Sequence, residues 1–238
     1  MNILRKKQSE NSLDLQSIKP LTTNQHCVFE EYNKDKNLLL HGMAGTGKTF
    51  CALYLALKEI FNSKINKHKV YIVRSAVPTR DVGFLPGSLK EKMKQYEAPY
   101  RSICTELFNR GDAYEILKTK DYIEFMSTSF VRGSTYNNCV LIVDEIQNLT
   151  YHELDSIITR AGDDTRLVFS GDFRQSDLTR EQDRAGLLEF IKVLNIMPSV
   201  SSIEFGIEDV VRSGLVKEYL LAKHKLFTWH YKLTMLYY

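Results

Sequence analysis

Residues Gly42 to Thr49 read GMAGTGKT, in which a glycine is followed by four residues and then by Gly-Lys-Thr. The apolar run Leu38–Leu40 precedes this stretch, and an apolar, helix-favouring run from Phe50 to Phe61 follows it. A strand, a glycine-rich loop and a helix in this order distinguish a phosphate-binding loop (P-loop) from a chance match to the spacing. A glycine-rich turn without chemistry is the alternative, and it does not need these flanks. The stretch therefore predicts an α/β protein built around a P-loop.

The chemistry of the loop follows from its residue types. Glycines let successive backbone N–H groups face inward around phosphate oxygens, and the positive end of the next helix points at the same anion. We expect Lys48 to reach the β- and γ-phosphates of a nucleoside triphosphate and Thr49 to bind Mg²⁺. The predicted nucleotide contacts in this loop are Gly42, Met43, Ala44, Gly45, Thr46, Gly47, Lys48, Thr49 and Phe50.

A pair of carboxylates follows a second apolar run. Val140–Val143 is unbroken and apolar, which predicts a buried strand, and Asp144 and Glu145 come directly after it. We expect Asp144 to bind the magnesium ion through its water shell and Glu145 to polarise the attacking water. A surface acidic turn is the alternative, but the preceding strand must be buried.

Two glutamines are further candidates. Gln25 lies ahead of the strand that enters the P-loop, and its amide can both accept from and donate to an adenine; a solvated helix cap is the alternative. Gln175 follows the apolar run Leu167–Ser170, where it could contact the γ-phosphate or the attacking water. A plain turn residue is the alternative for Gln175.

The composition describes an ordinary globular chain. Its 238 residues suit one domain with room for an insertion, and 43% of them are hydrophobic. No window of about 18 apolar residues is present, so we expect no membrane segment. The four cysteines form no CxxC pair, which favours reduced thiols and a cytoplasmic protein.

The charge is unevenly distributed along the chain. Residues 58–94 contain nine Lys or Arg and three Asp or Glu, whereas residues 140–189 contain five and eleven. A basic segment beside a nucleotide site can attract a nucleic-acid backbone, and Arg74 and Arg80 are the candidate contacts. A solvated basic surface explains the same count.

Periodicity divides the chain into segments. Residues 1–19 are polar and predict a loose N-terminal arm, and residues 20–225 form the main domain. Within it, a helical insertion is expected over about 82–122, and helical segments over Tyr151–Ala161 and Glu208–His224, the latter with a break at Gly214. Residues 226–238 form an aromatic tail that is either a partner contact or a poorly ordered end.

Several motifs together resemble a known family. GMAGTGKT, VDEIQN and SGDFRQSDL resemble motifs I, II and III of superfamily 1 helicases, and GFLPGSLKEK, RGSTYNN and EDVVRSGLV narrow the resemblance to the PhoH-like family. The resemblance runs from about Leu21 to His224 and implies a RecA-like ATPase core with a mostly parallel sheet. It assigns Gln25 to the adenine and Arg212 to a finger-like role. It also implies a role in RNA or DNA metabolism and a link to phosphate starvation.

The short form, without a PIN-type nuclease domain, is similar to versions found in large bacteriophages, which would place the protein in the host cytoplasm. Our leading hypothesis is an ATPase with ATP and Mg²⁺ as cofactors, coupled to RNA or single-stranded DNA. Its catalytic residues would be Lys48, Glu145, Gln175 and Arg212. A P-loop kinase for a small molecule or nucleotide, and a nucleic-acid binding module that does not turn over ATP, are the alternatives.

A superfamily 1 helicase needs two RecA-like lobes, and 238 residues hold one. The missing arginine would then come from a neighbouring subunit, which predicts a homo-oligomer such as a ring. Arg212 is the expected finger in trans, and Arg174 is its rival.

Overall fold

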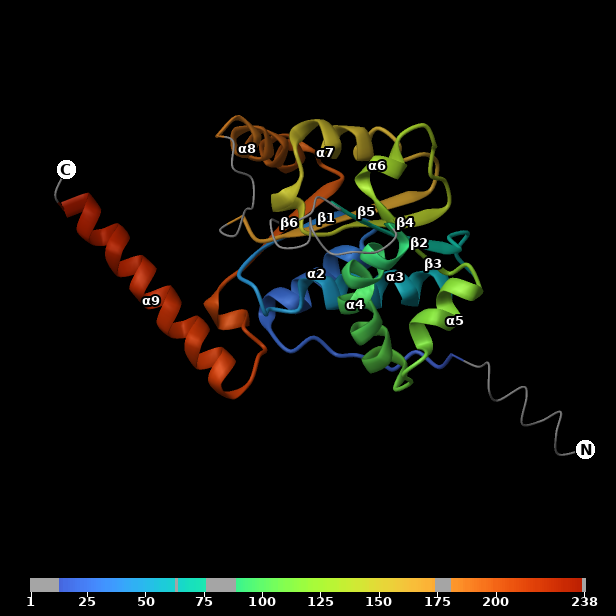
Figure 1. The fold of residues 1–238 in the computed structure, drawn as a ribbon, viewed down its shortest axis with the longest axis horizontal. Helices are drawn as coiled ribbons and strands as arrows, with labels where there is room; N and C mark the ends of the chain where they lie inside the picture. The colour runs from blue at the N-terminus through green and yellow to red at the C-terminus, as the bar shows by residue number, and fades with distance from the viewer. Residues whose placement is uncertain (1–12, 63, 76–88, 174–180, 237–238) are drawn as a thin grey trace, which may run out of the picture.

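A single sheet of six strands forms the centre of the molecule. The computed structural model describes residues 13–62, 64–75, 89–173 and 181–236 (Figure 1). The strand order is β3-β2-β4-β5-β1-β6, and every strand pair is parallel. The strands are β1 (Asn37–Gly42), β2 (Lys69–Arg74), β3 (Ile123–Ser127), β4 (Cys139–Val143), β5 (Thr165–Gly171) and β6 (Val200–Phe205).

Helices cover both faces of the sheet, as a parallel sheet requires (Figure 1). One face carries α2 (Thr23–Asn33), α3 (Lys48–Ile60), α4 (Leu89–Phe108) and α5 (Ala113–Thr119). The other carries α6 (Thr128–Val131), α7 (Tyr151–Ile158) and α8 (Glu181–Ile196). The remaining elements are the 3₁₀ turns η1 (Ile146–Asn148) and η2 (Ile207–Asp209), and helix α9 (Gly214–Leu236).

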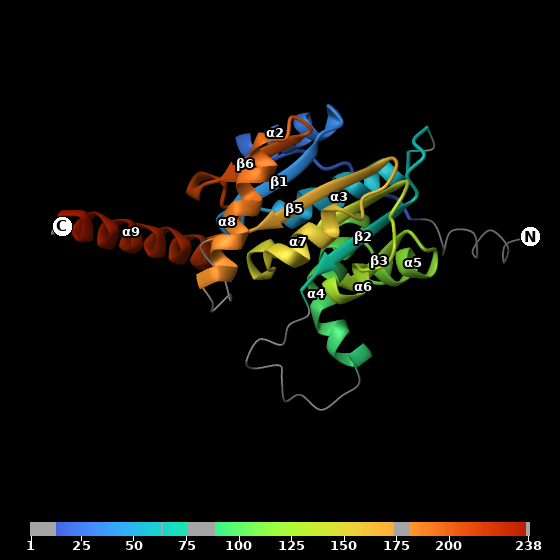
Figure 2. The same ribbon diagram turned by 90° about the horizontal axis from the view of Figure 1, so that it is seen from above.

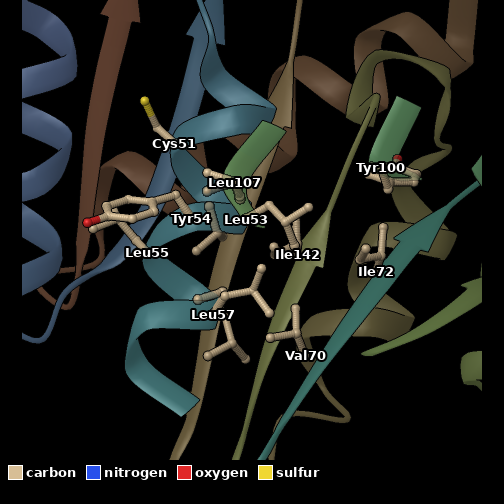
Figure 3. Close-up of a cluster of buried hydrophobic side chains, with 14 of the residues drawn as sticks. Cys51, Leu53, Tyr54, Leu55, Leu57, Val70, Ile72, Tyr100, Leu107 and Ile142 are labelled. Atoms are coloured by element: carbon tan, nitrogen blue, oxygen red, sulfur yellow. The ribbon is translucent and has the colours of Figure 1, made fainter. Parts of the chain in front are cut away.

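The alternation of side chains along the strands divides the core into two layers. Leu38 and Leu40 of β1 pack toward the α3 face, whereas Leu39 packs toward α7 and α8. Figure 3 shows the first layer, where side chains of α3 lie against Val70 and Ile142 of the sheet. Continuous apolar runs therefore form these strands because both of their faces are buried.

The connections between strands leave a crevice at the carboxyl ends of the strands. Strand β1 leads through α3 to β2, while its neighbour β5 leads through α8 to β6 on the other side. Because α3 and α8 lie on opposite faces, the connections that follow β1 and β5 run in opposite directions from the carboxyl ends of these strands. This is the position where α/β sheets bind ligands. The prediction of a P-loop α/β fold with a parallel sheet flanked by helices is confirmed.

The helical block predicted over residues 82–122 forms the crossover from β2 to β3. Its described helices, α4 and α5, contribute buried residues such as Tyr100 and Leu107 to the first core layer (Figure 3). The block therefore covers the sheet as part of the framework.

The segment after β6 differs from the prediction. The sequence predicts a helix from Glu208, but residues 210–213 are irregular and α9 begins at Gly214. The Asp209 carboxylate accepts hydrogen bonds from the N–H of Gly206 (2.9 Å) and from the Asn24 side chain (2.7 Å). These hydrogen bonds hold the chain near α2 in a conformation that a continuous helix could not adopt.

The structure describes part of each end of the chain. The arm predicted to be loose over residues 1–19 is attached in its described part, because the N–H of Gln16 donates to the carbonyl of Leu107 (2.8 Å) and Ile18 packs on the core. The predicted tail continues as helix α9 up to Leu236, and α9 projects away from the sheet (Figure 1, Figure 2). Across the described residues, we find no helix with the length and apolarity that a bilayer crossing needs.

The corner between β1 and the P-loop generates a test. Gly42 has a φ of +111°, and a Cβ there would lie 2.2 Å from the carbonyl oxygen of Phe205. Gly133 has a φ of +92° with nothing within 4 Å, so it is a matched control for backbone strain alone. We expect Gly133→Ala to lower the free energy of unfolding by roughly 1–2 kcal/mol, and Gly42→Ala by ~1–3 kcal/mol more through overpacking.

Urea denaturation of both variants measures the difference. Equal losses would mean that the loop moves away from Phe205 without penalty, and that this close approach does not fix the P-loop.

Candidate nucleotide site

The P-loop joins β1 to α3 and holds its lysine inward. Lys48 is 8% exposed, and its ammonium group donates to the carbonyls of Gly42 (2.9 Å) and Met43 (2.7 Å). Burial lowers the pKa of Lys48, and the negative charges of Asp172, Asp144 and Glu145 act against that decrease. The lysine is therefore a largely buried cation whose charge is favoured by three carboxylates, and its role at a triphosphate stays a prediction.

Thr49 and Asp144 meet across the crevice although β5 separates their strands. The Thr49 hydroxyl donates to Oδ1 of Asp144 (3.1 Å), and the Tyr100 hydroxyl of α4 donates to Oδ2 (2.9 Å). Burial, and then the charge of Asp144, raise the pKa of Tyr100 well above its ordinary value, so this hydroxyl stays a donor at neutral pH. Oxygen ligands of this kind suit Mg²⁺, so the residues fit the predicted metal.

Glu145 is held in an unusual backbone conformation. Its φ is +55°, in the left-handed region that non-glycine residues seldom adopt, and such conformations cluster at functional sites. Burial and the neighbouring Asp144 raise the pKa of Glu145, while Arg74, Gln147 and Lys48 favour its charged form. Glu145 lines the same cleft as Lys48 and Asp144, and its role in polarising water stays a prediction.

Gln147 is a functional candidate that our sequence analysis did not select. Its amide nitrogen donates to the Glu145 carboxylate, and its amide oxygen accepts from the N–H of Asp172 (3.0 Å). The amide therefore connects the ends of β4 and β5. The available signal was its place two residues after the acidic pair, in VDEIQN.

Arg74 lies beside the carboxylates that follow β4. It ends β2, whose Val73 pairs with Val143 of β4, so the next residues of both strands are neighbours. Its guanidinium lies 5.7 Å from the centre of the Tyr96 ring. Burial acts to lower the pKa of Arg74, but Tyr100, Glu145 and Asp144 raise it overall. The structure thus gives Arg74 partners within its own chain, and Arg80 lies outside the described residues.

The Gln25 amide also has partners within the chain. Its oxygen accepts from the N–H of Leu21 (2.8 Å) and its nitrogen donates to the carbonyl of Thr46 (2.9 Å). The side chain is buried and ties α2 to the P-loop. An adenine contact has to use the remaining N–H and lone pair of this amide, or displace one of these bonds.

Arg212 lies on the P-loop of its own chain. The N–H of Val211 donates to the carbonyl of Gly45 (3.1 Å), and a Cβ on Gly45 would lie 3.0 Å from Cγ of Arg212. Its side chain is exposed at the mouth of the crevice. The alternative arginine, Arg174, and Gln175 lie outside the described residues.

Most of these side chains, though not Tyr96 and Tyr100, line one cleft of about 1110 Å³. It includes the P-loop, the carboxylates at the ends of β4 and β5, Arg74 and Arg212, and it extends between residues 17–21 and α4. The volume is slightly above the usual range for a small-molecule site, and the cleft is lined by several polar and charged groups. The arrangement is suited to a nucleotide whose phosphates lie at the P-loop.

Comparison with known proteins identifies relatives. The family model described as PhoH-like protein matches residues 17–223. A PhoH-like protein of Mycobacterium leprae is 30% identical over 85% of this chain and 57% of its own length. A PhoH-like protein of Bacillus subtilis is 34% identical over 77% of this chain and 57% of its own length. The chain thus spans less than two thirds of these relatives.

Among solved structures, the large terminase of a thermophilic bacteriophage in complex with ADP is similar, with 12% identity and a TM-score of 0.49. The similarity covers 84% of this chain and 49% of that one.

Proposed function

The chain belongs to the PhoH-like family, and from this membership and the geometry of the cleft we propose that it binds ATP with Mg²⁺ and hydrolyses the ATP. The observation that carries the proposal is the contact between Thr49 and Asp144 beside Glu145. It brings the P-loop hydroxyl, a metal-binding carboxylate and a candidate for orienting water into one cleft, which are the parts that P-loop hydrolysis uses.

Each residue has a distinct role in this proposal. Lys48 and the backbone N–H groups of the P-loop bind the β- and γ-phosphates, while Thr49 and Asp144 hold the metal. When bound, Mg²⁺ neutralises the charge that develops on the phosphates. Glu145 accepts a hydrogen bond from the attacking water, and Gln147 fixes the direction of that carboxylate. A water held in line with the γ-phosphate can then attack it. The water oxygen bonds to the γ-phosphorus as the bond to the β–γ bridging oxygen breaks, Glu145 takes the water proton, and ADP and phosphate leave.

Two variants distinguish the binding of ATP and Mg²⁺ from the hydrolysis of ATP. We expect Glu145→Gln to bind ATP and Mg²⁺ but to release phosphate about 10²-fold or more slowly, because it loses a general base. We expect Asp144→Ala to weaken metal-dependent binding instead. Phosphate release and nucleotide titrations with and without Mg²⁺ measure both effects. Unchanged turnover in Glu145→Gln would mean that another residue orients the water.

The polymer partner is proposed to be RNA or single-stranded DNA. The support is the basic stretch 58–94, from which Arg74 and two lysines must be removed because they have partners within the chain. Lys67 bonds Asp164 and Lys69 bonds Asp121, at 2.6 Å and 2.5 Å. Lys94 on α4 is exposed, and α4 reaches the carboxyl end of β4 through the contact of Tyr100 with Asp144. Phosphate backbones are attracted to such charge.

Charge reversal tests this partner. We expect Arg80→Glu with Lys94→Glu to weaken binding to all single strands alike and to flatten its salt dependence, because fewer counterions are released. Lys58→Glu is the control for the single variant Lys94→Glu, since each reverses one charge and this exposed lysine lies at the other end of the stretch, in the second half of α3, away from the crevice. Fluorescence anisotropy across a salt series measures the slope. If the variants bind single strands with the same affinity and the same salt dependence, the basic stretch is only a solvated surface.

The position of Arg212 changes the oligomer hypothesis. The sequence predicts a finger in trans because a single lobe would lack an arginine, but Arg212 lies on its own P-loop. We therefore propose that Arg212 contacts the phosphates bound in its own chain. A homo-oligomer or ring is then not needed to complete the site.

Mixing two inactive variants distinguishes the arrangements. Arg212→Ala should lose roughly 10³-fold in rate, the scale of an arginine finger, and Lys48→Ala should lose nucleotide binding. If Arg212 acts in cis, a mixture of the two stays inactive at every ratio. Recovery of phosphate release in the mixture would contradict this proposal. It would show that Arg212 acts in trans at a site shared between subunits.

A further inference from the structure

Helix α4 reaches the metal-binding carboxylate through one side chain. The Tyr100 hydroxyl donates to Oδ2 of Asp144 (2.9 Å), while the other oxygen, Oδ1, accepts from Thr49 (3.1 Å). Asp144 is 5% exposed and Tyr100 is 1% exposed, so water has little access to either group. The two hydroxyls thus act on opposite oxygens and fix the rotation of the carboxylate.

We propose that Tyr100 is a positioning residue for Asp144: its hydroxyl turns Oδ1 of the carboxylate toward Thr49 and so sets the affinity of the site for Mg²⁺. The inference rests on the proposed function, because it concerns the metal that this function needs. Carboxylate ligands are commonly oriented by a hydrogen bond to their second oxygen, and loss of such a bond costs about 10–100-fold in metal affinity or activity.

The surroundings of Tyr100 make its hydroxyl a fixed donor. Its ring lies 5.6 Å from the ring of Phe125 on β3, and Cys104 and Leu107, on the same side of α4, belong to the same core layer (Figure 3). A ring packed in this way cannot leave without opening a cavity. Arg74 also lies beside Tyr100, so the hydroxyl is held between a cation and the carboxylate that it serves.

The neighbouring charges give the hydroxyl its importance. Asp144 and Glu145 are consecutive residues whose carboxylates line the same cleft, and two negative charges close together repel one another. Without the Tyr100 hydroxyl, the Oδ2 atom loses a donor and the carboxylate is free to rotate toward Arg74 or Lys48. Such a rotation would move Oδ1 away from Thr49, which leaves the metal with a misdirected ligand.

Tyr100→Phe removes the hydroxyl and keeps the packed ring. We expect the Mg²⁺ concentration for half-maximal phosphate release to rise about 10–100-fold, with a smaller change in the rate at saturating Mg²⁺. Mn²⁺ binding in the presence of ADP is a readout that needs no turnover, and electron paramagnetic resonance measures it. The affinity for Mn²⁺ should fall by the same factor. Binding of ADP without metal should stay unchanged.

Tyr114→Phe is the matched control, because Tyr114 is a second fully buried tyrosine on the neighbouring helix α5. It should leave the metal dependence as in the parent. Urea denaturation of the metal-free proteins checks their folding. If Tyr100→Phe does not fold, Phe125→Leu keeps the hydroxyl but loosens its ring contact, and it should shift the metal dependence in the same direction by a smaller factor.

The outcomes separate this inference from the proposed function. If Asp144→Ala loses Mn²⁺ while Tyr100→Phe binds it as the parent does, the inference is overturned and the function stands. If Asp144→Ala itself keeps its Mn²⁺ affinity, the metal lies elsewhere and both fail. A loss in Tyr100→Phe that Tyr114→Phe shares would show a packing effect and would also overturn the inference.

Discussion

The hydrogen bond between Thr49 and Asp144 joins the two halves of the site, and the rest of the structure depends on the geometry that makes it. Thr49 lies in the first turn of the helix after β1, whereas Asp144 follows β4, and β5 lies between those two strands. The contact therefore requires that the sheet has its observed order and that β1 and β4 end at the same level. A change in either would separate the phosphate-binding loop from the carboxylates.

Positive and negative side chains balance one another in the cleft, and each charged residue contributes to this balance. Lys48 and Arg74 are cations at least partly withdrawn from water, and Asp144, Glu145 and Asp172 are the anions that face them. A buried charge without a partner is costly, so removing one cation leaves carboxylates that repel one another. The left-handed backbone at Glu145 adds strain at the same place. Such a balance suits a site whose ligand is itself a highly charged anion with a cation.

The sequence predicted the parts of the fold whose signals are local. Apolar runs such as Val140–Val143 predict buried strands because residues near in sequence decide them, and the P-loop spacing fixes its own conformation. Arg74 lies beside Asp144 because of strand register, and Arg212 lies on Gly45 because Asp209 holds the chain near α2. Neither placement has a local signal. The contact of Tyr100 depends on where α4 packs, which periodicity does not give.

We propose that this one chain carries a complete phosphate and metal site, which makes ATP binding by the isolated protein the decisive measurement. Calorimetric titration of the parent with a non-hydrolysable ATP analogue and Mg²⁺ should show binding to the isolated protein. Lys48→Ala, shown by circular dichroism to be folded, should bind at least roughly tenfold more weakly, because a charged hydrogen-bond donor is lost. Equal affinities in the two proteins would contradict the assignment of Gly42–Thr49 as the phosphate site.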